Sequence, residues 1–135
     1  MNRTLFTSFA CVPLAIGAIA ALAPSVLLGS MKGAEVTPAA EVMARTAGVL
    51  LVAIGALNLA VRHHPPSATL RAVVAFDLSI QLLLLPIDPL AWAAGTFTTL
   101  GSFVPNTALH LVLAAVFTKW LVVDLREPSH RPTLG

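Results

Sequence analysis

The sequence predicts an all-α protein, a four-helix transmembrane bundle in a single domain with both termini in the cytoplasm. Composition is the first observation behind this fold class: 57% of the 135 residues are hydrophobic, 10% are charged, and the mean hydropathy is +0.88. Soluble domains are typically about a quarter charged, so this chain lacks the polar residues to cover a surface in water. Four long apolar windows are the second observation, and helices satisfy their backbone hydrogen bonds inside lipid.

Each window approaches the roughly 20 apolar residues that a transmembrane helix needs. The predicted spans cover about residues 5–28, 42–61, 70–90 and 106–125. The first span resembles a secretory signal peptide, because the basic Arg3 precedes it and an Ala-Leu-Ala triplet at residues 21–23 resembles a cleavage site. Pro24 follows the triplet directly and the apolar run continues to Leu28. We therefore expect a retained helix rather than a cleaved signal.

The third span is the weakest of the four. Residues 70–85 include ten Leu, Ile, Val or Phe side chains, each contributing roughly −0.3 to −0.6 kcal/mol to insertion, whereas a central Asp costs about 2.5–3.5 kcal/mol. Because Asp77 and Gln81 are both present, insertion is marginal and should depend on neighbouring helices. Pro86 and Pro89 can kink or end a helix, so we expect either a bent continuation or a segment at the membrane interface.

The Lys and Arg residues set the expected orientation, because they are enriched in the cytoplasmic loops of membrane proteins. With four spans, the N-terminus, the 62–71 turn and the C-terminal tail share one side. Six of the eight basic residues fall there: Arg3, Arg62, Arg71, Lys119, Arg126 and Arg131. Lys32 and Arg45 are on the opposite side. We therefore expect cytoplasmic termini and a multi-pass protein of the inner (cell) membrane.

Polar residues at membrane depth are costly and tend to be functional or inward-facing. Near the outer side, Glu41 and Arg45 are four residues apart on the second span, and Asn106 and His110 have the same spacing on the fourth, so each pair shares a helix face. If both faces point inward, Arg45 and His110 meet. The group predicts either a polar pocket for a headgroup, a quinone carbonyl or a small acid, or a structural salt bridge beside a hydrogen-bonded histidine.

A second polar layer, nearer the cytoplasm, contains Asn58, Asp77 and Gln81. Asp77 and Gln81 are four residues apart and should both face into the bundle. Lys119 lies nine residues after His110, on nearly the opposite helix face, so we expect it to reach the cytoplasmic interface. Asp77 would then bond to Asn58 or Gln81, or be protonated. Interhelical hydrogen bonding and a proton-relay or transport site are the two interpretations of this layer.

Small residues indicate where helices pack closely. Gly17 with Ala21, and Ala44 with Gly48, are each four residues apart, a spacing that lets two helix backbones approach. The contact lies either within the bundle or with a partner protein, and the sequence leaves both open.

Several functions lack support in the sequence. The net charge is +2 and no basic cluster occurs, so nothing indicates nucleic-acid binding. The single cysteine, Cys11, rules out an internal disulfide and a CxxC pair. His63 and His64 lie on the opposite side from His110, and we predict no metal site. No catalytic residue is identified and no cofactor is predicted, although a quinone or a lipid would suit the polar pocket.

The order of these motifs resembles a known family. APSVLLG at residues 23–29 is followed by ARTAG at residues 44–48, by Gly55 and Arg62, and by a Pro-bearing turn into LRAV. Over about the first 75 residues this layout resembles the small bacterial four-helix membrane proteins described as DoxX-like. The family takes its name from a quinone-linked thiosulfate oxidoreductase subunit, and the resemblance implies four membrane helices. Its matching positions are Arg45 and Gly48. The ARTAG string is also similar to the scaffold protein of ergosterol biosynthesis, another four-helix membrane protein.

Two functions follow as expectations. The short loops, the missing catalytic motif and the small-residue faces favour a non-enzymatic accessory or scaffold subunit of a larger membrane complex or a homo-oligomer. The alternative is a protein that binds a small lipophile, a quinone or a lipid, or a quinone-linked oxidoreductase component, using Arg45, His110 and Asp77. A proton-coupled transporter ranks third, because four short helices without a broken-helix repeat make a poor carrier. The expected partners are the lipid bilayer and other membrane subunits or a second copy, with no nucleic acid.

Overall fold

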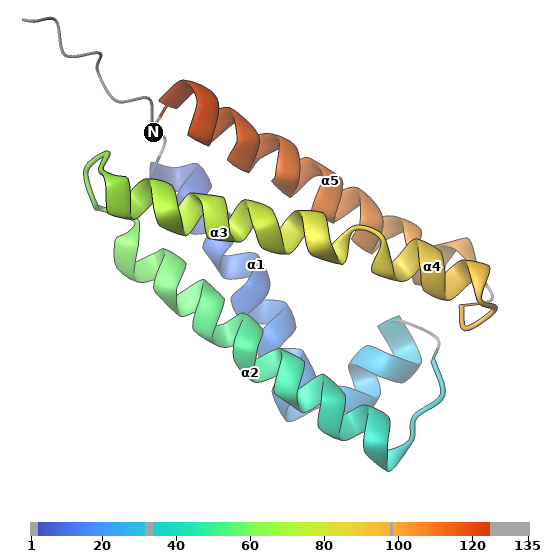
Figure 1. Cartoon of the computed structure of the whole chain (residues 1–135). Helices are drawn as coiled ribbons and strands as arrows, with labels where there is room; N and C mark the ends of the chain where they lie inside the picture. Colours follow the sequence, from blue (N-terminus) through green and yellow to red (C-terminus); the bar gives the residue numbers. More distant parts are fainter. Residues whose placement is uncertain (1–2, 32–33, 98, 125–135) are drawn as a thin grey trace, which may run out of the picture.

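The computed structural model describes residues 3–31, 34–97 and 99–124, and every regular element in these residues is helical (Figure 1). The elements are α1 (Arg3–Leu22), η1 (Val26–Met31), α2 (Pro38–Val61), α3 (Ala68–Leu84), α4 (Ile87–Ala93), η2 (Leu100–Ser102), α5 (Val104–Lys119) and η3 (Trp120–Asp124). The prediction of an all-α fold is confirmed. Of the residues used above to predict span ends and orientation, Lys32, Leu125, Arg126 and Arg131 lie outside the described residues.

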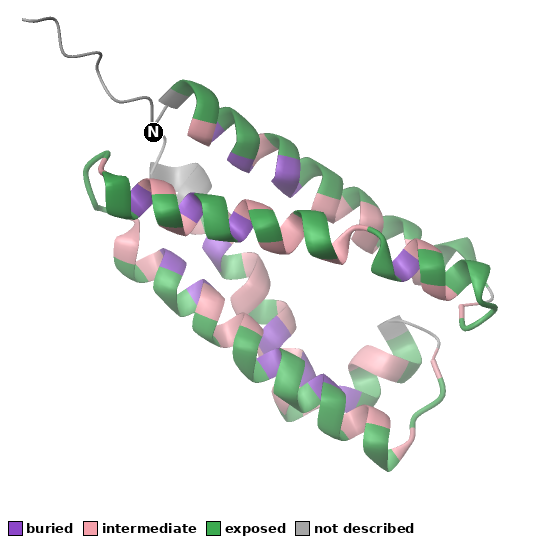
Figure 2. Cartoon of the chain, in the orientation of Figure 1, coloured by how far each residue is buried: buried purple, intermediate pink, exposed green. Residues whose placement is uncertain are grey.

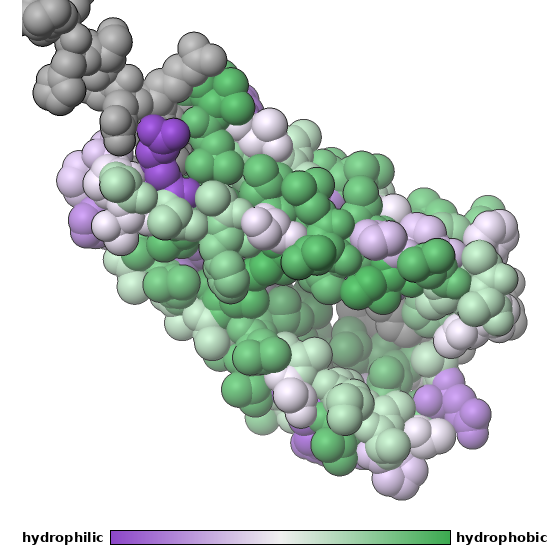
Figure 3. All heavy atoms as spheres, in the orientation of Figure 1, coloured by the Kyte–Doolittle hydropathy of each residue, from purple (hydrophilic) through white to green (hydrophobic). Residues whose placement is uncertain are grey.

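Three helical stretches are long and apolar enough to cross a membrane: Pro38–Val61, Ala68–Ala93 and Val104–Val123. A shorter apolar stretch, Thr7–Leu22, lies in α1. Large apolar side chains point outward from these helices, and Leu83, for example, is 72% exposed. The visible surface is accordingly apolar over much of its area (Figure 3). Such a surface is unfavourable in water and suits contact with acyl chains, so these helices belong to a membrane protein.

The first predicted window is divided in the structure. α1 ends at Leu22, and η1 turns away from the α1 axis a few residues later (Figure 1). Pro24 lies at this break and is almost fully buried. Proline cannot donate a backbone hydrogen bond and its ring clashes with the preceding turn, so the expected single helix over residues 5–28 does not form.

The third predicted window continues past its prolines as a bent helix. Ser67 caps the start of α3 by accepting a hydrogen bond from the Leu70 amide (3.2 Å), as N-cap serines do. Pro86 separates the end of α3 from the start of α4, and α4 extends the same apolar stretch to Ala93. Of the two expected alternatives, the structure has the bent continuation, which extends the polar face of α3 into α4.

The helices associate as two pairs, α1 with α2 and α3 with α5 (Figure 1), and buried residues lie mainly on the facing sides (Figure 2). The pairs meet where Phe9 of α1 contacts two aromatic residues of the C-terminal helix. Its ring centroid is 6.2 Å from that of Phe117 and 5.9 Å from that of Trp120. Leu70 and Val74 of α3 complete this buried apolar cluster. We call this end of the bundle the aromatic end.

The α1–α2 contact is made by backbone against backbone. A Cβ atom added to Gly48 would lie 2.5 Å from the Ala21 amide nitrogen and 2.7 Å from the Gly17 carbonyl oxygen. One added to Gly17 would lie 2.7 Å from the Gly48 carbonyl oxygen. Only glycine permits such an approach. For these small residues, the sequence left open whether they pack within the bundle or against a partner protein. In the structure, Gly17 and Gly48 pack against each other within the chain.

Candidate functional site

A cavity of about 250 Å³ lies between the two helix pairs, next to the aromatic end. In the space-filling view the surface is hollowed between the α3–α4 arm and α2 (Figure 3). The residues that line the cavity come from five helices: Phe9, Val12, Pro13 and Ile16 (α1); Leu51, Ile54 and Asn58 (α2); Asp77, Ile80, Gln81 and Leu84 (α3); Asp88 (α4); Asn106, Leu109, His110, Leu113 and Phe117 (α5).

The two walls of the cavity differ in polarity. The α1–α2 wall is apolar except for Asn58. The opposite wall, from α3, α4 and α5, has five polar or charged side chains, which we call the polar wall: Asp77, Gln81, Asp88, Asn106 and His110. A cavity with one apolar and one polar wall matches a ligand that has an apolar body and a polar head.

Four side chains of the polar wall form one hydrogen-bonded chain across three helices. The Asn106 Nδ2 amide donates to Asp88 Oδ2 at 2.7 Å and lies 3.2 Å from His110 Nε2. His110 Nδ1 is 2.6 Å from Gln81 Oε1. The chain links α5 to both α3 and α4, so it holds the bent helix against α5.

The direction of each bond follows from the carboxylate at one end. An ionised carboxylate only accepts hydrogen bonds, so Asn106 turns its NH₂ group toward Asp88. The same NH₂ group faces His110 Nε2, which must therefore accept, and the ring hydrogen lies on Nδ1. His110 Nδ1 then donates to Gln81 Oε1. This tautomer is inferred from the network.

Two groups of the chain keep hydrogen-bonding capacity. The NH₂ group of Gln81 and the Oδ1 atom of Asn106 have no protein partner among the described residues. Both residues line the cavity. The polar wall therefore offers a ligand one amide donor and one amide acceptor.

A second polar pair joins the two walls of the cavity, with one residue from each wall. Asp77 of α3 is 2% exposed, Asn58 of α2 is 5% exposed, and the Asn58 side chain is the hydrogen-bonding neighbour of the Asp77 carboxyl. Asp77 Oδ2 and Asn58 Oδ1 have no partner among the described residues. This pair is the polar contact between the two helix pairs at the cavity.

The structure regroups the residues that the sequence singled out. Asn106 and His110 do lie together, but with Gln81, which was predicted to belong to the other layer. Rise per residue gives depth along one helix, but it does not give the shift between two helices. Asn106 and His110 of the predicted outer layer therefore line the same cavity as the predicted inner layer. Lys119 is exposed and does not line the cavity.

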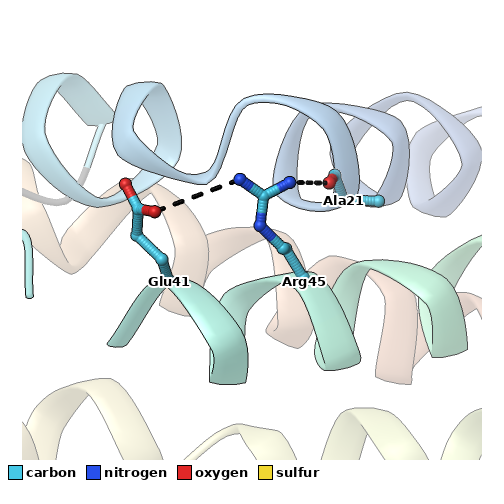
Figure 4. Close-up of polar contacts among 3 residues, drawn as sticks. All are labelled: Ala21, Glu41 and Arg45. Carbon is cyan, nitrogen blue, oxygen red and sulfur yellow. Dashed lines mark hydrogen bonds and ion pairs between the residues drawn. The ribbon is translucent and has the colours of Figure 1, made fainter. Parts of the chain in front are cut away.

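The expected meeting of Arg45 with His110 is wrong. Arg45 Nη1 donates to the Ala21 carbonyl oxygen at 3.0 Å, near the end of α1, and Arg45 Nη2 lies 4.0 Å from Glu41 Oε2 (Figure 4). Neither Glu41 nor Arg45 lines the cavity. A cation is favourable at the C-terminal end of a helix, so the early end of α1 at Leu22 redirects Arg45 away from the bundle interior.

Asp88 was not among the residues that the sequence singled out. It lies in the segment after Pro86 that was expected to bend or to rest at the interface, and it is 8% exposed. A signal was present: Asp77, Gln81 and Asp88 are spaced by four and seven residues, which continues one helix face if the helix continues. Within the described residues, no three His, Cys, Asp or Glu side chains are grouped to hold a metal ion.

Comparison of the chain with protein-family models, with curated proteins and with solved structures gives no match. The resemblance to the DoxX-like proteins therefore stays a prediction.

Proposed function

We propose that this protein binds a small lipophilic molecule within the bilayer. The single observation behind the proposal is the cavity with one apolar and one polar wall. The apolar body of the ligand would lie against α1 and α2, and its polar head would contact α3, α4 and α5. Four spans in the inner (cell) membrane with cytoplasmic termini are part of the proposal, supported by the distribution of Lys and Arg.

Unused hydrogen-bonding capacity favours binding over a purely structural role. Polar groups that only join helices in a membrane are expected to satisfy one another, because an unpaired group there is costly. Here Gln81 and Asn106 line the cavity, and the Gln81 NH₂ group and Asn106 Oδ1 have no protein partner among the described residues. A quinone carbonyl or a lipid headgroup would accept from the amide of Gln81.

The accessory-subunit hypothesis loses one of its supports. It rested partly on the small-residue faces, and in the described residues Gly17 and Gly48 pack against each other within the chain. Lipophile binding therefore replaces it as the main proposal. Contact with the bilayer, with other subunits or with a second copy stays a prediction.

The test is to fill the cavity with a large side chain and to identify which copurifying small molecule is then lost. Val12 is half-buried and lines the cavity, so Val12→Trp should displace a bound molecule. Val49 of α2 is 61% exposed and outside the cavity, which makes Val49→Trp the matched control.

Both variants and the wild type are purified in nanodiscs, and the bound small molecules are extracted and identified by mass spectrometry. We expect one lipophile to copurify with the wild type and with Val49→Trp, and to be depleted at least about tenfold in Val12→Trp. Equal occupancy in all three proteins would remove the proposal. Native mass spectrometry of the same samples shows whether the protein is instead bound to other subunits and to no ligand.

A further inference from the structure

The second polar pair of the cavity indicates what kind of head the ligand has. Asn58 Oδ1 and Asp77 Oδ2 are buried oxygen atoms without a hydrogen-bond partner among the described residues, and both residues line the cavity. When it is ionised, the Asp77 carboxylate can only accept hydrogen bonds, so Asn58 then turns its NH₂ group toward it. Both remaining atoms are therefore acceptors, and the group that would satisfy them is a donor.

Charge around the cavity points to a cationic donor. The lining includes two carboxyl groups, those of Asp77 and Asp88, and no Lys or Arg. The basic side chains nearest in sequence to the lining residues of α2 and α5 do not line the cavity. Arg62, four residues after Asn58, donates to the Leu59 carbonyl oxygen and to His63 Nε2. Arg45 donates to the Ala21 carbonyl oxygen, and Lys119 is exposed. For Asp77, whose Oδ2 atom has no hydrogen-bond partner among the described residues, an ionised carboxylate without a positive partner is strongly unfavourable in an apolar medium.

We propose that the ligand is a lipophilic amine, whose protonated nitrogen lies between Asp77 and Asn58 Oδ1 while its apolar body fills the cavity. The proposal rests on the proposed function and narrows it to one chemical class. An ammonium group has three donors and no acceptor, so it can donate a hydrogen bond to each of these two oxygen atoms. A lipophilic acid is disfavoured, because its carboxylate would face two others.

A proton bound to Asp77 is the competing explanation. A protonated carboxyl can donate to Asn58 Oδ1 and accept from Asn58 Nδ2, which also satisfies both atoms. The two explanations predict different relative affinities. An ionised Asp77 should bind a protonated amine more tightly than a neutral molecule of the same shape, whereas a protonated Asp77 should bind the two about equally.

The experiment compares octylamine with 1-octanol, which have the same alkyl chain and differ in the head. Binding to the full chain is measured by calorimetry in phosphatidylcholine nanodiscs, with empty nanodiscs subtracted, since this lipid has no net charge to attract amines. The variants are Asp77→Asn, which keeps the side-chain volume, the cavity-filling Val12→Trp, and Glu35→Gln. Glu35 is an exposed acid outside the cavity, so its variant controls for the change in net charge.

We expect the wild type and Glu35→Gln to bind octylamine about 10- to 100-fold more tightly than 1-octanol, the range of a charge-assisted hydrogen bond. Asp77→Asn should reduce the preference to about twofold or less, and Val12→Trp should weaken both ligands. Equal affinities in the wild type, with loss of both in Val12→Trp, would overturn the amine proposal and leave lipophile binding standing. If Val12→Trp weakens the binding of neither ligand, both the amine proposal and lipophile binding in this cavity are overturned. The wild-type comparison decides even if Asp77→Asn fails to fold.

Discussion

The α1–α2 contact is made of backbone, whereas the α3–α5 contact is made of side chains. Between α1 and α2, carbonyl and amide groups approach so closely that a single added methyl group would collide with them. Between α3 and α5, apolar side chains pack at the aromatic end, and a hydrogen-bonded chain joins the helices beside the cavity. A backbone contact has no rotamers with which to adjust, but side chains can turn. The cavity wall formed by α3 and α5 is therefore the adaptable one.

The largest loss of stability should come from breaking the backbone contact between α1 and α2. Gly48→Leu inserts a side chain where the first added carbon already lies 2.5 Å from a backbone nitrogen, so α1 and α2 must separate. We expect a loss of about 3 kcal/mol or more in the free energy of unfolding, measured by equilibrium unfolding in mixed micelles.

Gly101 is the matched control for this substitution, because the nearest atom to a Cβ there is 3.9 Å away. Gly101→Leu should change the free energy of unfolding by less than about 0.5 kcal/mol. A similar loss in both variants would mean that the close approach of α1 and α2 does not set the stability.

The aromatic end should show an intermediate effect. Phe117→Ala removes a buried ring that contacts both Phe9 and Trp120. The expected loss is about 2 kcal/mol, less than in a soluble core, because lipid is as apolar as the protein interior and only packing is lost. Phe76, which is 52% exposed on α3, is the control, and Phe76→Ala should be nearly neutral. Equal losses of stability in the two variants would mean that the aromatic cluster does not stabilise the fold.

The hydrogen-bonded chain of the polar wall should contribute less to stability than the buried ring of Phe117. A double-mutant cycle with His110→Leu and Gln81→Leu should give a coupling free energy of about 1 kcal/mol, as is usual for interhelical hydrogen bonds in membranes. The same unfolding assay measures it. Pairing His110→Leu with Ser79→Ala is the control cycle, since Ser79 bonds to its own helix. A coupling of zero in the first cycle would mean that the 2.6 Å contact contributes nothing to stability.

The smallest effect is expected at the Glu41–Arg45 ion pair. Its atoms are 4.0 Å apart and its side chains are 34% and 51% exposed, so Glu41→Gln should cost less than about 0.5 kcal/mol. Arg45→Ala should cost more, because it also removes the hydrogen bond to the Ala21 carbonyl. If the two variants were equally destabilised, the bond to α1 would be irrelevant.

Residue types and spacings predicted an all-helical fold and most polar residues of the cavity. They also marked Gly48 as a point of close helix packing, but they did not show whether its partner lies in this chain. They did not predict which residues meet. Gln81 was assigned to the wrong partner because the shift of α3 against α5 is a tertiary property. Arg45 was placed with His110 because both helix faces were assumed to point inward, whereas Arg45 bonds to the Ala21 carbonyl oxygen near the end of α1. Asp88 was missed because a proline can either stop a helix or bend it, and only the bend brings Asp88 to Asn106.

The position of Asn58 bears on how the chain is assembled during synthesis. Chains are made from the N-terminus and tend to fold in that order, and the tight α1–α2 hairpin uses no residue beyond Val61. It can therefore form before α3 leaves the ribosome. α3 is the span that enters lipid with most difficulty, because it contains Asp77. A preformed hairpin that presents Asn58 to Asp77 would lower this barrier, and the first half of the chain would then aid the insertion of the second.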